Sequence, residues 1–109
     1  KQDYAQARQW YQKAAEQGYA VAQYNIGVMY FKGQGVKQDY GQARQWYQKA
    51  AAQGYAQAQN DLGVMYANGQ GGKQDYGQAR RWFQKAAEQG HADAQHNFGL
   101  LSNPFYLSR

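Results

Sequence analysis

The 109-residue sequence has no cysteine, a single proline and few charged residues. Without cysteine the chain cannot form a disulfide scaffold, use a thiol in catalysis or bind a metal through thiolates. With one proline, helices or strands can run without interruption. No apolar run approaches the roughly 18 to 20 residues of a membrane-spanning helix. Since 43% of the residues are hydrophobic and 17% aromatic, against 17% charged, the composition predicts a folded domain rather than a disordered chain.

The sequence repeats itself with a period of 36 residues. Residues 1–36 match residues 37–72 at 27 of 36 positions, and residues 73–98 follow the same pattern before the third copy diverges after Gly99. Periods of 20 to 50 residues are typical of solenoid proteins, in which each unit packs only against its neighbours. We therefore expect one domain over 1–109, with repeat units near 1–36, 37–72 and 73–109.

The first half of each unit has the pattern of an amphipathic helix. Apolar residues recur at spacings of three and four, at Tyr4, Ala7, Tyr11, Ala14 and Ala15 in the first copy. Capping boxes predict where these helices begin, with Asp3 and Gln6, Asp39 and Gln42, and Asp75 and Gln78. Glycines predict where they end, at Gly18, Gly54 and Gly90.

The second half of each unit predicts another helix, with Ala22, Ile26, Met29 and Tyr30 at helical spacing and a glycine turn after it. Gly27, Gly63 and Gly99 interrupt these helices at a cost of about 0.8 to 1 kcal/mol relative to alanine, so we expect close helix approach at each. The predicted helices lie near 3–17, 20–32, 39–53, 56–68, 75–89 and 92–101. The fold class expected is all-α, a right-handed α/α superhelix of about three helix pairs.

These residues resemble the Sel1-like repeats, relatives of the tetratricopeptide repeats. The family pattern, A-x-x-x-L-G-x-x-Y-x-x-G-x-G followed by D-Y-x-x-A-x-x-W-Y-x-K-A-A, is matched first by Ala22, Ile26, Gly27, Tyr30, Gly33, Gly35, Asp39, Tyr40, Ala43, Trp46, Tyr47, Lys49, Ala50 and Ala51. It recurs 36 residues later, from Ala58 to Ala87. The resemblance implies an adaptor module whose L-G-x-x-Y helices line a concave groove that receives a peptide or a partner domain.

In the family's phase the chain opens on a second helix and closes on a first one, so both ends look cut from a longer array. The exposed repeat faces predict possible end-to-end self-association. Alternatively, the divergent stretch after Gly99 forms a C-terminal cap, with Phe105, Tyr106 and Leu107 folded back over the last apolar face. We expect a bacterial protein, periplasmic or secreted in preference to cytoplasmic.

The three copies differ most in their second helices, where offsets of three, four and seven residues place much of the variation on one face. Packing shared by all copies does not determine these positions, so we interpret them as the lining of a partner-binding groove. Tyr24, Asn60, Asp61 and His96 are the expected anchors. The full predicted lining is Val21, Tyr24, Asn25, Val28, Gln57, Asn60, Asp61, Val64, Asp93, His96 and Asn97.

Two alternatives to the binding groove remain open. In the first, the variation between copies is the drift of exposed positions, and the chain is a structural spacer within a larger protein. Basic residues also recur with the repeat, at Lys1, Lys37, Lys73, Arg8, Arg44, Arg80, Lys13, Lys49 and Lys85, and on the outer face they would bind an anionic polymer. Interspersed acidic residues favour a solvated helix face instead, so we expect a protein or peptide partner and no nucleic acid.

We expect no enzymatic activity, no cofactor and no metal site. His91 and His96 are five residues apart, about 140 degrees around a helix, whereas two metal-binding histidines on one helix face are four apart. Neither Ser102 nor Ser108 is followed three residues later by lysine, as serine acyl transfer requires in penicillin-binding enzymes. Trp10, Trp46 and Trp82 lie beside the apolar stripe of each first helix, which favours packing between repeats over ligand stacking.

Overall fold

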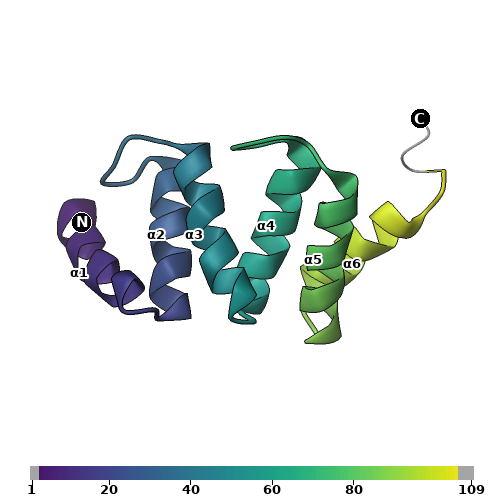
Figure 1. Cartoon of the computed structure of the whole chain (residues 1–109), viewed down its shortest axis with the longest axis horizontal. Helices are drawn as coiled ribbons and strands as arrows, with labels where there is room; N and C mark the ends of the chain where they lie inside the picture. The colour runs from purple at the N-terminus through teal and green to yellow at the C-terminus, as the bar shows by residue number, and fades with distance from the viewer. Residues whose placement is uncertain (1–2, 106–109) are drawn as a thin grey trace.

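Six α-helices follow one another in the computed structural model, which describes residues 3–105 (Figure 1). The predicted all-α repeat architecture and the six helices are confirmed, with ends that differ by at most one residue from the expected ones. No helix among these residues is long and apolar enough to cross a membrane. The helices are α1 (Tyr4–Glu16), α2 (Ala20–Lys32), α3 (Tyr40–Ala52), α4 (Ala56–Asn68), α5 (Tyr76–Glu88) and α6 (Ala92–Ser102).

Local signals in each repeat begin and end the helices. The Asp39 carboxylate accepts a hydrogen bond from the Gln42 backbone N–H at 3.0 Å, and Asp3 and Asp75 cap α1 and α5 in the same way. Gly33 adopts the left-handed conformation, with φ of +72°, and ends α2. These caps provide partners for backbone groups that have none inside the helix.

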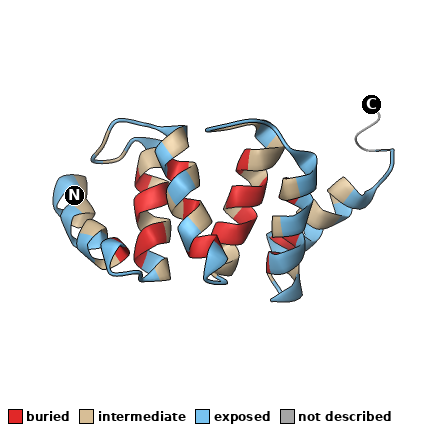
Figure 2. Cartoon of the chain, in the orientation of Figure 1, coloured by how far each residue is buried: buried red, intermediate tan, exposed pale blue. Residues whose placement is uncertain are grey.

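The helices stack in chain order, so that each packs against the one before and the one after it (Figure 1). The stack measures 46 × 25 × 24 Å. Buried side chains concentrate in α2, α3 and α4 (Figure 2), where Ile26, Leu62 and Met65 are fully enclosed. Because α1 and α6 each pack against a helix on one side only in the part of the chain that the structure describes, less of their surface is buried. The chain is a helical-repeat solenoid.

Two of the three glycines inside the second helices allow aromatic side chains to approach closely. A Cβ on Gly27 would lie 2.6 Å from the Tyr47 ring, and a Cβ on Gly63 would lie 2.6 Å from the Phe83 ring. The expectation of close approach is therefore confirmed at both positions. It is wrong at Gly99, where a Cβ would meet nothing within 4 Å, because no further helix packs against α6 in the described residues.

The exposure of the tryptophans and of the C-terminal tail also depends on where each residue lies in the stack. Trp46 and Trp82 pack against the core of the preceding repeat, as predicted. Trp10 is 66% exposed, because no repeat packs before α1 within residues 3–105, and the prediction fails for it. Phe105 is 78% exposed and does not cover an apolar face. Tyr106 and Leu107, the other residues expected to cap that face, lie outside the described residues.

Candidate functional site

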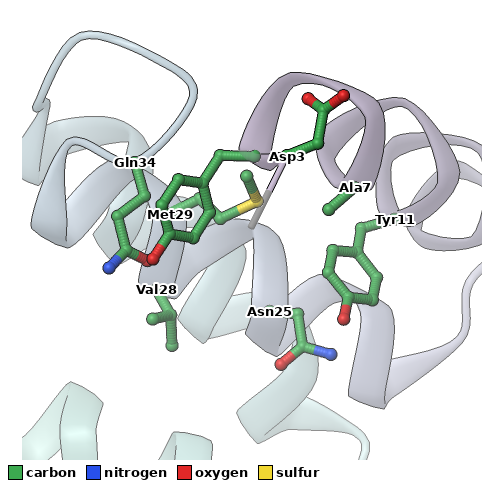
Figure 3. Close-up of a pocket in the computed structure, with 8 residues that line it drawn as sticks. Asp3, Ala7, Tyr11, Asn25, Val28, Met29 and Gln34 are labelled. Carbon is green, nitrogen blue, oxygen red and sulfur yellow. The ribbon is translucent and has the colours of Figure 1, made fainter. Parts of the chain in front are cut away.

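Three cavities follow one another along α2, α4 and α6. The end cavity, of about 390 Å³, lies between α1 and α2 (Figure 3). The first junction cavity, of about 220 Å³, lies among α2, α3 and α4, and the second junction cavity, of about 160 Å³, among α4, α5 and α6. Val28 lines both the end cavity and the first junction cavity, and Val64 lines both junction cavities. The shared valines show that the cavities are adjacent, and we refer to this row of three cavities as the groove.

The end cavity is bounded by α1 on one side and α2 on the other. In Figure 3 Ala7 and Tyr11 come from α1, while Asn25, Val28 and Met29 come from α2. Tyr11 is 37% exposed here, whereas its counterpart Tyr47, one repeat later, is buried under α2. The end cavity is thus the place that a preceding helix fills in the interior of the stack.

The two junction cavities are equivalent positions of successive repeats. Six pairs of residues, each 36 apart, line the first and the second cavity respectively: Val28 and Val64, Phe31 and Ala67, Lys32 and Asn68, Tyr47 and Phe83, Asp61 and Asn97, and Val64 and Leu100. The backbone forms the same hollow at both junctions. The side chains inside it differ in charge, aromatic content and volume.

The first junction cavity is built on an aromatic cluster. The Tyr24 ring stacks on the Tyr47 ring with centroids 5.4 Å apart, and Tyr55 packs against Tyr24 at 5.3 Å. The Tyr24 hydroxyl donates a hydrogen bond of 2.7 Å to the Asp61 carboxylate. Burial, with that hydrogen bond and the Asp61 charge, raises the pKa of Tyr24 far above its ordinary value. Tyr24 therefore remains a neutral donor throughout the physiological pH range.

Asp61 is held by further donors from its own helix. The Gln57 side-chain amide donates to Asp61 Oδ1 at 2.9 Å, and the Asn60 amide approaches the same oxygen at 3.5 Å. Gln57 in turn contacts His91 Nε2 through Oε1 at 2.8 Å. Because His91 Nδ1 accepts a hydrogen bond from the Ala94 N–H, Nε2 carries the proton and donates to Gln57. A directed chain of hydrogen bonds thus leads from His91 to the Asp61 carboxylate.

At the second junction, a hydrogen bond between two neutral side chains takes the place of the Tyr24–Asp61 hydrogen bond. Asn97 donates to Asn60 Oδ1 at 3.1 Å, and the two residues are 37 apart, as are Tyr24 and Asp61. Asn60 is only 5% exposed, which leaves its amide little access to a partner. Its observed role is to connect α4 to α6, and this differs from the direct anchor that we expected.

The structure brings together six of the eleven predicted groove residues, all of which line the cavities: Tyr24, Asn25, Val28, Asp61, Val64 and Asn97. Gln57 lines none of these three cavities but donates a hydrogen bond to Asp61, and Asn60 is buried. The other three, Val21, Asp93 and His96, are exposed and line none of the cavities described here.

The prediction missed several lining residues: Phe31, Lys32, Tyr47, Ala67, Asn68, Phe83, Leu100 and Leu101. Phe31 and Lys32 differ from their counterparts in the next copy, and Phe31 lies at helical spacing from Tyr24 and Val28. The variation between copies therefore contained the information needed to include these two residues in the lining. Tyr47 and Phe83 gave no such signal, because an aromatic residue at that position also fits the repeat core.

Two of the recurring arginines are engaged in packing. The Arg44 guanidinium lies 4.1 Å from the centre of the Tyr66 ring and donates to the carbonyls of Met65 and Lys73. Arg80 lies 4.7 Å from the centre of the Phe98 ring and donates to the Ser102 hydroxyl. These contacts fix the arginines between repeats, so they form no freely available basic surface.

Comparison with known proteins places these observations in a family. The Sel1 repeat model matches residues 1–19, 20–55 and 56–91. A Sel1 repeat protein from Oxalobacter formigenes is 41% identical with a TM-score of 0.88, over 92% of this chain and 41% of that one. A protective antigen of uropathogenic Escherichia coli with an SLR fold is 48% identical with a TM-score of 0.84, over 85% of this chain and 20% of that one.

Cysteine-rich protein B of Helicobacter pylori is 28% identical with a TM-score of 0.83, over 87% of this chain and 71% of that one. No curated protein matches. The chain spans less than half the length of the first two structures, and all three relatives are bacterial. Sel1 repeats generally act as protein-interaction scaffolds and are a non-catalytic family. On the strength of three matched repeats over residues 1–91, the chain belongs to the Sel1 repeat family.

Proposed function

We propose that the groove along α2, α4 and α6 binds an extended peptide segment of a partner protein. The observation that carries this proposal is the row of three adjacent cavities, in which neighbouring cavities share Val28 or Val64. An extended chain spans at most about 3.3 to 3.6 Å per residue, so a peptide of about six to nine residues reaches roughly 20 to 30 Å along the 46 Å length of the stack.

Differences between the copies support the same assignment. Phe31, Lys32 and Asp61 differ from Ala67, Asn68 and Asn97, although the surrounding backbone is repeated. Side chains that vary within a constant frame are the usual means by which helical-repeat proteins choose partners. Binding to an anionic polymer is less well supported, because Arg44 and Arg80 already contact rings and polar groups of their own chain.

The test is selection from a random nine-residue peptide library, followed by affinity measurements on variants. Val64→Glu places a charge between the two junction cavities, and Gln45→Glu adds the same charge to the exposed side of α3 as a matched control. We expect selected peptides to bind the wild type and Gln45→Glu equally, and to lose at least tenfold in affinity for a folded Val64→Glu. Equal binding to Val64→Glu, or no selected peptides at all, would contradict the proposal and favour a spacer.

A further inference from the structure

The first junction cavity is sized for a single side chain. At about 220 Å³ it lies below the range of roughly 300 to 1,000 Å³ typical of small-molecule pockets. It lies between the two other cavities of the groove, because Val28 and Val64, which line it, also line one of those cavities each. A peptide lying in the groove would therefore insert one residue here. The chemistry of the walls decides which residue that is.

Asp61 places a carboxylate in the cavity wall without a cation to pair with it. Its oxygens accept hydrogen bonds from Tyr24, Gln57 and Asn60, all of which are neutral groups. No lysine, arginine or histidine of residues 3–105 lies within ion-pair distance of it. Each carboxylate oxygen has more than one lone-pair site, so capacity to accept remains. The neutral donors hold the carboxylate in place before a ligand arrives.

Aromatic rings form much of the remaining wall, with Tyr24, Phe31 and Tyr47 lining the same cavity as Asp61. Guanidinium groups pack on aromatic rings and donate to carboxylates through several N–H groups at once, whereas an ammonium is more strongly hydrated and makes point contacts. The chain itself contains two guanidinium groups packed on aromatic rings, Arg44 on Tyr66 and Arg80 on Phe98. The combination of a fixed carboxylate and aromatic walls is complementary to arginine.

We propose that the first junction cavity binds an arginine side chain, presented by the peptide that the groove is proposed to bind. The guanidinium donates to Asp61 and packs against the rings of Phe31 and its aromatic neighbours. That a peptide presents the arginine rests on the proposed function. That the cavity binds an arginine side chain does not. In the second junction cavity Asn97 and Ala67 replace Asp61 and Phe31, and the arginine site is confined to the first junction.

Lys32 opposes the ligand and provides an internal check. It lines the cavity and is exposed, and its charge has the same sign as a guanidinium. Its removal should therefore strengthen arginine binding, whereas removal of the Asp61 charge should weaken it. A site governed by shape alone would respond to neither charge in this way.

The experiment uses single blocked amino acids as probes, so that it does not depend on peptide binding. Arginine, citrulline and lysine, each as its N-acetyl amide, are titrated into the full chain while NMR signals of Val28 and Val64 are followed. We expect arginine to bind about tenfold more tightly than citrulline, which has the same shape without the charge, and more tightly than lysine. Asp61→Asn should abolish the preference over citrulline, and Lys32→Ala should increase affinity for arginine about twofold.

Asp61→Asn keeps an oxygen to accept from Tyr24, and an unchanged circular dichroism spectrum and melting temperature would verify its fold. Equal binding of arginine and citrulline, or an arginine preference that survives in folded Asp61→Asn, would overturn the inference. The two proposals fail separately. Library peptides that bind in the groove without arginine overturn only this inference, and arginine binding without any selected peptide overturns only the proposed function.

Discussion

The two repeat junctions have the same framework and different contents. In the framework, Tyr47 packs against Gly27 as Phe83 packs against Gly63. Gln53 donates to Gly18 and Gln23 across the first junction, and Gln89 donates to Gly54 and Gln59 across the second. The side chains inside the cavities differ. The carboxylate of Asp61 and the phenyl ring of Phe31 at the first junction correspond to the amide of Asn97 and the methyl group of Ala67 at the second.

This difference separates residues that build the solenoid from residues that are free to vary. A change at Gly27 or Tyr47 would alter how two repeats pack, so both junctions keep the same arrangement. Asp61 and Phe31 also contact the framework, through the Tyr24 hydroxyl and the Tyr47 ring, but Asn97 and Ala67 at the equivalent positions show that the same frame accepts other side chains. The position of a variable residue relative to the junction is therefore more informative about binding than variability alone.

The largest expected effect concerns the aromatic residues of the framework. Tyr47→Ala and Phe83→Ala should each lower the free energy of unfolding by about 3 to 5 kcal/mol, because both rings are buried between repeats. Tyr11→Ala, at the equivalent but more exposed position of α1, should cost clearly less. Urea denaturation followed by circular dichroism measures all three. A Tyr11→Ala loss as large as the other two would show that packing between repeats is not what these rings provide.

Alanine at the helix glycines should give effects of opposite sign. Gly27→Ala and Gly63→Ala should destabilise the fold by about 1 to 3 kcal/mol, since each new methyl group would overlap an aromatic ring. Gly99→Ala should stabilise it by up to about 1 kcal/mol, because α6 has open space there and alanine favours helix. The same denaturation series compares them. Stabilisation by Gly63→Ala would refute the close-approach account.

The N-terminal caps of α3 and α5 should contribute equally to stability, because the same contact is repeated at both helices. Asp39→Ala and Asp75→Ala each remove one hydrogen bond to the first turn, at Gln42 and Gln78. Each should lower stability by about 1 kcal/mol, with the two values within experimental error of one another. Thermal melts of the two variants provide the measurement. A marked inequality would mean that the first turns of α3 and α5 differ in ways that the repeated contacts do not explain.

The prediction most specific to the first junction involves Tyr24 and concerns how stability depends on pH. Its pKa is raised in the folded state, so above pH 10 the unfolded chain releases a proton that the folded chain retains. The stability that this group contributes is present below pH 10 and is lost as the pH rises further. Tyr24→Phe should therefore flatten the alkaline decline of stability, measured by denaturation between pH 8 and 11. An equally steep decline in this variant would contradict the assignment.

The repeat period, the helices and their caps were predictable because local signals specify them three times. The groove was predictable in part, because Tyr24, Asp61 and their neighbours vary at helical spacing. Two features required the structure. The burial of Asn60 depends on how α4 and α6 pack, and Tyr47 lines the groove while also filling a space left by Gly27. Residues that serve both packing and surface give no separate signal in the sequence.

The most direct test of the groove is the response of the four valines of the chain to a bound peptide. Val28 and Val64 line the cavities, while Val21 and Val36 line none of them. With valine methyl groups labelled for NMR, a library-selected peptide should shift the signals of Val28 and Val64 and leave those of Val21 and Val36 in place. Shifts confined to Val21 and Val36 would place the peptide outside the groove and contradict the account.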